Sequence, residues 1–121
     1  MILASCSAAL RDRAVVWTEQ GLAAAELQWD EAFHERLRYC RNTHPPKTPA
    51  AEQCFGPWYD ADRAVDTAVR SAVAVLRTYW TARAAGEREP GWTETQARVA
   101  QIVGDLPPHA RQYFERIKGI R

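Results

Sequence analysis

Apolar side chains recur every three or four residues along most of the chain, which is the spacing of one face of an α-helix. This spacing predicts one long helix from Ser7 to about Arg41, with charged residues on its other sides. Only Gly21 departs from the helical pattern. The main stripe consists of Leu22, Ala25, Trp29, Phe33, Leu37 and Cys40. Leu10, Ala14 and Trp17 continue a similar stripe toward the N-terminus with a small drift. At 1.5 Å per residue, such a helix would be about 50 Å long.

A second helix is predicted from about Tyr59 to Ala85, with Asp60 or Asp62 accepting the unpaired amide protons of its first turn. Its apolar stripe comprises Ala61, Val65, Ala68, Ala72, Leu76 and Tyr79, with Val69, Val73 and Trp80 alongside. We expect residues 42–56 to form a stiff connection, because their prolines lack an amide proton and restrict the preceding residue. Two long helices joined in this way predict an antiparallel hairpin.

The last third of the chain predicts two short helices. Thr93 and Gln96 have the spacing of a capping box, with Trp92 in the position of a hydrophobic staple, so one helix is expected over 93–103. The other follows Pro107 and Pro108 to about Lys118. Its apolar face would comprise Ala110, Tyr113, Phe114 and Ile117.

The predicted fold class is therefore all-α: a long antiparallel helical hairpin capped by two short C-terminal helices. Within a single domain, residues 1–6 form a tail or lipobox remnant, residues 7–86 the hairpin and residues 87–121 the cap.

Composition narrows the function classes only a little. The chain has 121 residues, with 16 Lys and Arg against 15 Asp and Glu, so its formal charge of +1 creates no field that would attract nucleic acid. No apolar run approaches the 18 residues or so of a membrane-spanning helix. Five Trp and four Tyr are many for this length. They supply buried area to a thin helical core, or alternatively line an interface.

Two of the three cysteines suggest a disulfide. Cys40 lies at the end of the first predicted helix and Cys54 just before the second, so the hairpin would bring them together. A disulfide there would stabilise the fold by roughly 3 kcal/mol in the chain-entropy model and would imply an oxidising compartment. The alternative is two unpaired, half-buried thiols in a cytosolic protein.

The third cysteine, Cys6, stands in the tetrapeptide Leu3-Ala4-Ser5-Cys6, which resembles the lipobox of bacterial lipoproteins. The resemblance implies lipidation of Cys6 after cleavage before it, and hence a tether to a membrane without a spanning helix. Only Met1 and Ile2 precede the tetrapeptide, fewer residues than a signal peptide needs. Three explanations stay open: an upstream start codon, a trimmed sequence, or a chance match.

The sequence contains no recognised catalytic or metal-binding motif. His34, Cys40, His44 and Cys54 carry atoms that zinc prefers, but their spacing matches no known ligand pattern. No Asp or Asn is placed to orient either imidazole beside a cysteine nucleophile. Carboxylates such as Glu26 and Asp30 are interpreted as solvated surface. We therefore expect a protein that is not an enzyme and has no metal or cofactor.

The segment from Gln96 to Arg116 resembles a helix-turn-helix. Ala100 would lie at the close contact and Gly104 at the turn, with Val99, Val103, Ala110 and Tyr113 in the apolar positions. The candidate nucleic-acid contacts are His109, Arg111, Arg116 and Lys118. Asp105 falls where an apolar residue is expected, and two prolines displace the second helix. A two-helix cap is the favoured interpretation, and nucleic acid is not favoured as a partner.

The function expected from these patterns is binding to another protein, self-association or a structural role. The expected location is the cell envelope of a bacterium, where the chain would be exported or lipid-anchored. The protein itself would be encoded by the bacterium or by a phage. Two alternatives stay open: a cytosolic helical inhibitor or adaptor, and a DNA-binding regulator that uses residues 96–116.

Overall fold

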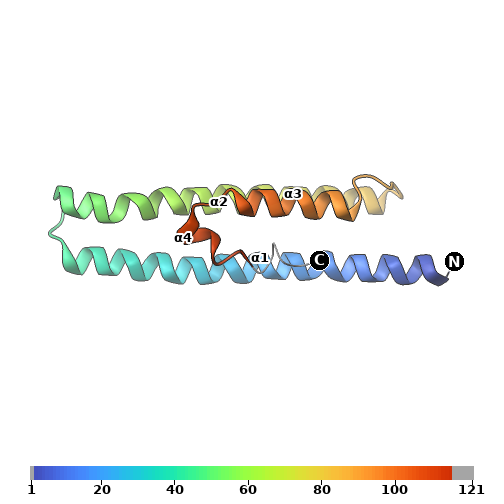
Figure 1. Cartoon of the computed structure of the whole chain (residues 1–121), viewed down its shortest axis with the longest axis horizontal. Coiled ribbons are helices and arrows are strands. Elements are labelled where there is room, and N and C mark those ends of the chain that lie inside the picture. Colours follow the sequence, from blue (N-terminus) through green and yellow to red (C-terminus); the bar gives the residue numbers. More distant parts are fainter. Residues whose placement is uncertain (1, 116–121) are drawn as a thin grey trace.

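Four helices make up the computed structural model, which describes the backbone of residues 2–115 and the side chains of residues 10–115. They are α1 (Ile2–Thr43), α2 (Pro49–Ala84), α3 (Trp92–Gly104) and α4 (Pro108–Arg111), and this part of the chain contains no strand. Figure 1 shows α1 and α2 side by side and antiparallel, with α3 and α4 against them. The predicted all-α class and the predicted hairpin are confirmed.

The core of the hairpin comes from the stripes that the sequence predicted, except near the N-terminus. Buried residues of α1 are Val15, Thr18, Leu22, Ala25, Trp29, Phe33, Leu37 and Cys40, and those of α2 include Ala61, Val65, Ala72, Leu76 and Tyr79. Leu10 and Trp17 do not continue this stripe, since they are 65% and 60% exposed. Stepping back seven residues from Leu22 leads to Val15, so the drift in the pattern carries Leu10 and Trp17 onto another face of α1.

Helix α2 begins ten residues earlier than predicted, and the connection is correspondingly short. Thr48 is the N-cap, and its hydroxyl accepts a hydrogen bond from the Ala51 amide at 3.2 Å. Pro49 occupies the first turn, where a missing amide proton costs nothing. Pro57 lies inside the helix after Gly56, which has no Cβ to clash with the proline ring. The predicted caps Asp60 and Asp62 are therefore wrong, and so is the predicted 42–56 connection.

Helix α3 runs back along α2 and covers one half of the hairpin. The Trp92 ring lies 5.7 Å from that of Tyr79 at the start of α3, and Ile102 at its other end shares a surface hollow with Ala64 and Ala68. This half lies away from the tight connection between α1 and α2 (Figure 1). The N-cap of α3 is Gly91, with no side-chain bond, so the predicted capping box is wrong.

Helix α4 is only one turn long, and it crosses from α2 toward α1 (Figure 1). Ala110 and Phe114 are buried and fix the segment to the core. Turns follow at residues 112–114, so the second short helix, predicted to run to about Lys118, is interrupted after Arg111. Its predicted end, Lys118, lies outside the described residues.

Candidate interaction surfaces

The cysteines of the hairpin meet at its closed end. Cys40 and Cys54 are joined by a disulfide, with their Cα atoms 5.7 Å apart. The bond joins the last turns of α1 to the first turns of α2, as the sequence predicted. Cys6 belongs to the first turns of α1, but its side chain is not among those that the structure describes. The lipidation of Cys6 therefore stays a prediction.

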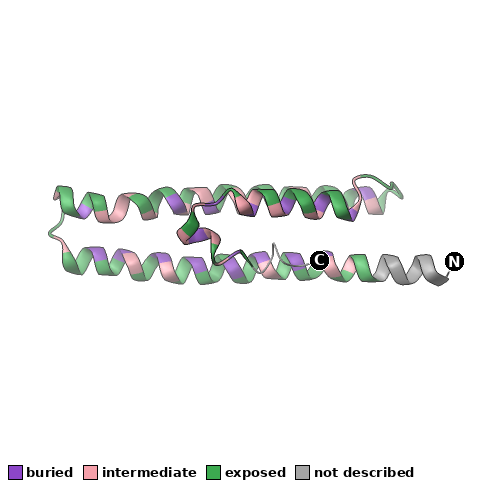
Figure 2. Ribbon diagram, in the orientation of Figure 1, coloured by how far each residue is buried: buried purple, intermediate pink, exposed green. Residues whose placement is uncertain are grey.

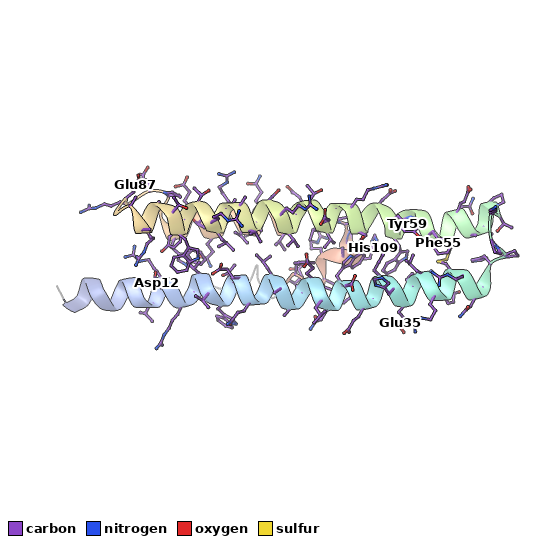
Figure 3. All side chains as sticks on the ribbon, turned by 180° about the vertical axis from the view of Figure 1, so that it is seen from behind. Asp12, Glu35, Phe55, Tyr59, Glu87 and His109 are labelled. Carbon is purple, nitrogen blue, oxygen red and sulfur yellow. A yellow bond between two sulfur atoms is a disulfide. The ribbon has the colours of Figure 1, made fainter. Side chains whose placement is uncertain are left out.

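An aromatic cluster fills the middle of the molecule. Trp29, 1% exposed, stacks on Trp58 at 5.5 Å between ring centroids. The ring centroids of His109 and Tyr113 each lie 6.0 Å from that of Trp29. Figure 3 shows His109 between the two long helices. These rings therefore serve as core, and they hold the α4 segment in place.

Two candidate nucleic-acid contacts are already engaged within this fold. His109 packs edge-on against Trp58 at 5.1 Å. Arg111 donates a hydrogen bond to the Gly104 carbonyl at 3.2 Å and lies 3.6 Å from a carboxylate oxygen of Glu115. The other two, Arg116 and Lys118, lie outside the described residues. The described part of α4, with four residues, is too short to lie along a major groove as a recognition helix.

The candidate zinc ligands are not brought together. Cys40 and Cys54 are bonded to each other, while His34 is exposed and lies 3.3 Å from Asp30 one turn earlier. Among the side chains that the structure describes, no three His, Cys, Asp or Glu residues are grouped as a metal site would require.

An acidic groove lies between α1 and α2, with a volume of about 830 Å³. Its polar walls carry Glu26, Asp30, Asp62, Arg63 and Asp66. Asp62 accepts a hydrogen bond from Trp29 at 2.9 Å, and Asp66 pairs with Arg70 at 3.3 Å. Asp66 is therefore neutralised by an arginine and Asp62 is already engaged by Trp29, which weakens the groove as a site for a cationic ligand.

The outer face of α1, turned away from the core, carries large apolar side chains. Leu10, Trp17 and Leu27 are 60–65% exposed and Val16 is 43% exposed. At 3.6 residues per turn, these four side chains fall within an arc of about 120°. Figure 2 shows exposed residues along the side of α1 opposite its buried stripe. The sequence pattern missed this face, because it assigned Leu10 and Trp17 to the core.

Comparison with protein families, with curated proteins and with solved structures gives no match. In residues 2–115, no helix is both long enough and apolar enough to cross a membrane.

Proposed function

We propose that this chain is a non-catalytic helical protein that acts by binding another polypeptide chain through the outer face of α1. The observation that carries the proposal is the exposure of Leu10, Val16, Trp17 and Leu27 on one side of one helix. Single exposed apolar residues are ordinary, but several large ones gathered on one face of one helix favour an interaction site. An exposed Trp strengthens the argument, because Trp is enriched among the residues that dominate binding energy.

The rest of the architecture supports a binding role for α1. The disulfide, the aromatic cluster and the ion pair between Arg83 and Asp12 at 3.1 Å hold α1 against α2 over most of its described length. A helix fixed in this way presents its outer side chains in a fixed order and spacing. A partner helix then meets a rigid surface and pays little ordering cost on the side of this chain.

The face can be tested by site-specific photocrosslinking in the native host. A photoreactive phenylalanine analogue is placed at Trp17 or at Leu27 in the full chain. The control places the same analogue at Arg77, an exposed residue of α2. We expect heavier adducts that contain a second polypeptide from positions 17 and 27, and none above background from position 77. Equal yields at all three positions, or no adduct at 17 and 27, would overturn the proposal.

For the cellular setting we propose the envelope, with a lipid tether at Cys6. The pairing of Cys40 with Cys54 supports this setting, since disulfides persist in oxidising compartments. It also leaves Cys6 as the one cysteine outside the pair. Intact mass of the protein from its host tests both parts. A gain of about two daltons on reduction and acyl chains on Cys6 are expected, whereas an unmodified chain with three thiols would contradict the setting.

A further inference from the structure

The exposed side of α1 carries a repeating pattern of its own. Starting at Leu10, steps of three and four residues lead along one face of α1 in a stripe that winds slowly around the helix, by about 20° every seven residues; we call it the outer stripe. Its members are Leu10, Arg13, Trp17, Gln20, Ala24, Leu27, Glu31 and His34, and every one of them is exposed. The alternation of three- and four-residue steps repeats every seven residues from Leu10 to Glu31, which is the repeat of the seam between two helices in a coiled coil. The stripe is about 36 Å long at 1.5 Å per residue.

The order of residues along the outer stripe is complementary to itself when one copy is reversed. In an antiparallel pair of identical helices, a residue of one copy lies opposite a residue of the other copy at the same level along the helix axis. For a given register, the two residue numbers of every such pair add up to the same value. A sum of 44 pairs Arg13 with Glu31, Trp17 with Leu27 and Gln20 with Ala24. Arg13 therefore faces an opposite charge and Trp17 faces the apolar Leu27, while at the ends of the stripe Leu10 faces His34. By symmetry each contact occurs twice.

Charge selects the antiparallel arrangement over the parallel one. A parallel pair would place Arg13 beside Arg13 and Glu31 beside Glu31, and like charges at such a seam are destabilising. Neither residue forms an ion pair within the described part of its own chain, whereas other charged residues such as Arg70 and Arg83 do. The charges of Arg13 and Glu31 are thus available to pair with a second copy.

Near its centre the stripe carries the small Ala24 opposite Gln20, and the small Ala23 lies beside it. The symmetry axis of this register passes near position 22, next to Ala23 and Ala24, both of which are exposed. Small side chains there let two helix backbones approach closely, and the bulky Trp17 and Leu27 then interlock on either side. The stripe suits a lipid surface less well, because Arg13, Gln20 and Glu31 would be pressed against acyl chains without partners.

We infer that α1 binds α1 of a second copy of this chain in an antiparallel register, with Arg13 opposite Glu31 and Trp17 opposite Leu27. This inference rests on the proposed function and names the partner. The dimer places the disulfide-bonded ends of the two molecules at opposite ends of the assembly. A two-helix seam of this length is at the small end of stable interfaces, so the dimer is expected to dissociate on dilution.

The test is sedimentation equilibrium of the full chain over a concentration range from about 1 to about 200 µM, spanning weak to moderate affinities. The chain carries Cys6→Ser, so that an intermolecular disulfide cannot produce a dimer. Arg13→Glu and Glu31→Arg are each expected to weaken dimerisation at least about tenfold, because like charges then face each other twice. The double variant restores opposite charges and should return to within about threefold of the parent. Arg77→Glu, a charge reversal away from the stripe, is the matched control. Thermal unfolding followed by circular dichroism confirms that each variant folds.

The outcomes separate this inference from the proposed function. Dimers weakened by both single reversals and restored by the double variant support the register. If the dissociation constant of the dimer is unchanged by the single charge reversals, the proposed register is wrong. A monomer at all concentrations overturns self-association, and crosslinking from Trp17 to a different protein would then leave the proposed function standing. A monomer that sediments with vesicles of phosphatidylethanolamine and phosphatidylglycerol, and loses this binding with Trp17→Glu, would assign the stripe to a lipid surface instead.

Discussion

The indole nitrogen of Trp29 donates a hydrogen bond to a carboxylate oxygen of Asp62 at 2.9 Å, which joins the middle of α1 to the middle of α2. Trp29 is 1% exposed and lies at the centre of the aromatic cluster. We expect Trp29→Phe to lower the free energy of unfolding by about 1–3 kcal/mol, because it removes the bond and part of the buried ring. Urea unfolding followed by circular dichroism measures the loss. The control is Trp80→Phe, since Trp80 bonds Glu19 at the surface at 3.2 Å. An equal loss in both variants would contradict a special role for Trp29.

The Cys40–Cys54 bond closes a loop with a sequence separation of 14 residues. Under non-reducing conditions, Cys40→Ser is expected to lower stability by about 2–4 kcal/mol, since the unfolded chain regains the freedom that the crosslink removes. Cys6→Ser should leave the thermal midpoint unchanged. A Cys40→Ser midpoint equal to that of the parent would show that the bond contributes nothing in solution.

Thr48 determines where α2 begins, through the bond that its hydroxyl accepts from the Ala51 amide. Thr48→Ala is expected to cost about 1 kcal/mol of unfolding free energy, the usual value for loss of an N-cap. Thr78→Ala is the matched comparison, because the Thr78 hydroxyl only donates back to the Ala74 carbonyl on an exposed part of the same helix. Its effect should stay within about 0.5 kcal/mol. A larger loss of unfolding free energy in Thr78→Ala than in Thr48→Ala would argue against Thr48 as the N-cap.

Gly86 ends α2 with a φ of +76°. Its amide donates to the Arg83 carbonyl at 3.0 Å and the next amide, of Glu87, donates to the Ala82 carbonyl at 2.8 Å, which is the Schellman arrangement. An added Cβ would meet nothing within 4 Å, so the cost of Gly86→Ala comes from the backbone alone. We expect a loss of about 1 kcal/mol. Gly86→Asn should lose less, because Asn tolerates this conformation better, and chemical denaturation compares the two.

The fold could be predicted from the sequence where the apolar spacing was regular. Leu22, Trp29 and Leu37 lie in the core because their spacing admits only one buried face. Trp17 was misplaced because α1 has two apolar faces near its N-terminus, and spacing alone does not say which of them packs against α2. The start of α2 had a readable signal: Thr48 before Pro49, with an acidic residue at position 52 in the first turn.

The surfaces were less predictable than the core. Glu26 and Asp30 were interpreted as solvated residues, and nothing local indicates that Asp62 and Asp66 lie across from them. That juxtaposition depends on the register of the hairpin, which the short connection sets. The outer stripe is visible in the sequence as a pattern, but its availability depends on which face of α1 the hairpin buries.

Helix α3 covers only one half of the hairpin, so the two halves differ in how easily their helices open locally. In the covered half, α2 packs against both α1 and α3, so its amide protons are protected by two neighbouring helices. Toward the disulfide, and among the residues that the structure describes, α1 and α2 pack mainly against each other, with partly exposed rings such as Tyr59 at their margin (Figure 3). Local opening there requires less free energy, so deuterium should enter the chain in a gradient, slowest beside α3 and fastest in the two-helix arm. The crosslink at the arm's end keeps its helices from separating widely, so these openings remain small and brief.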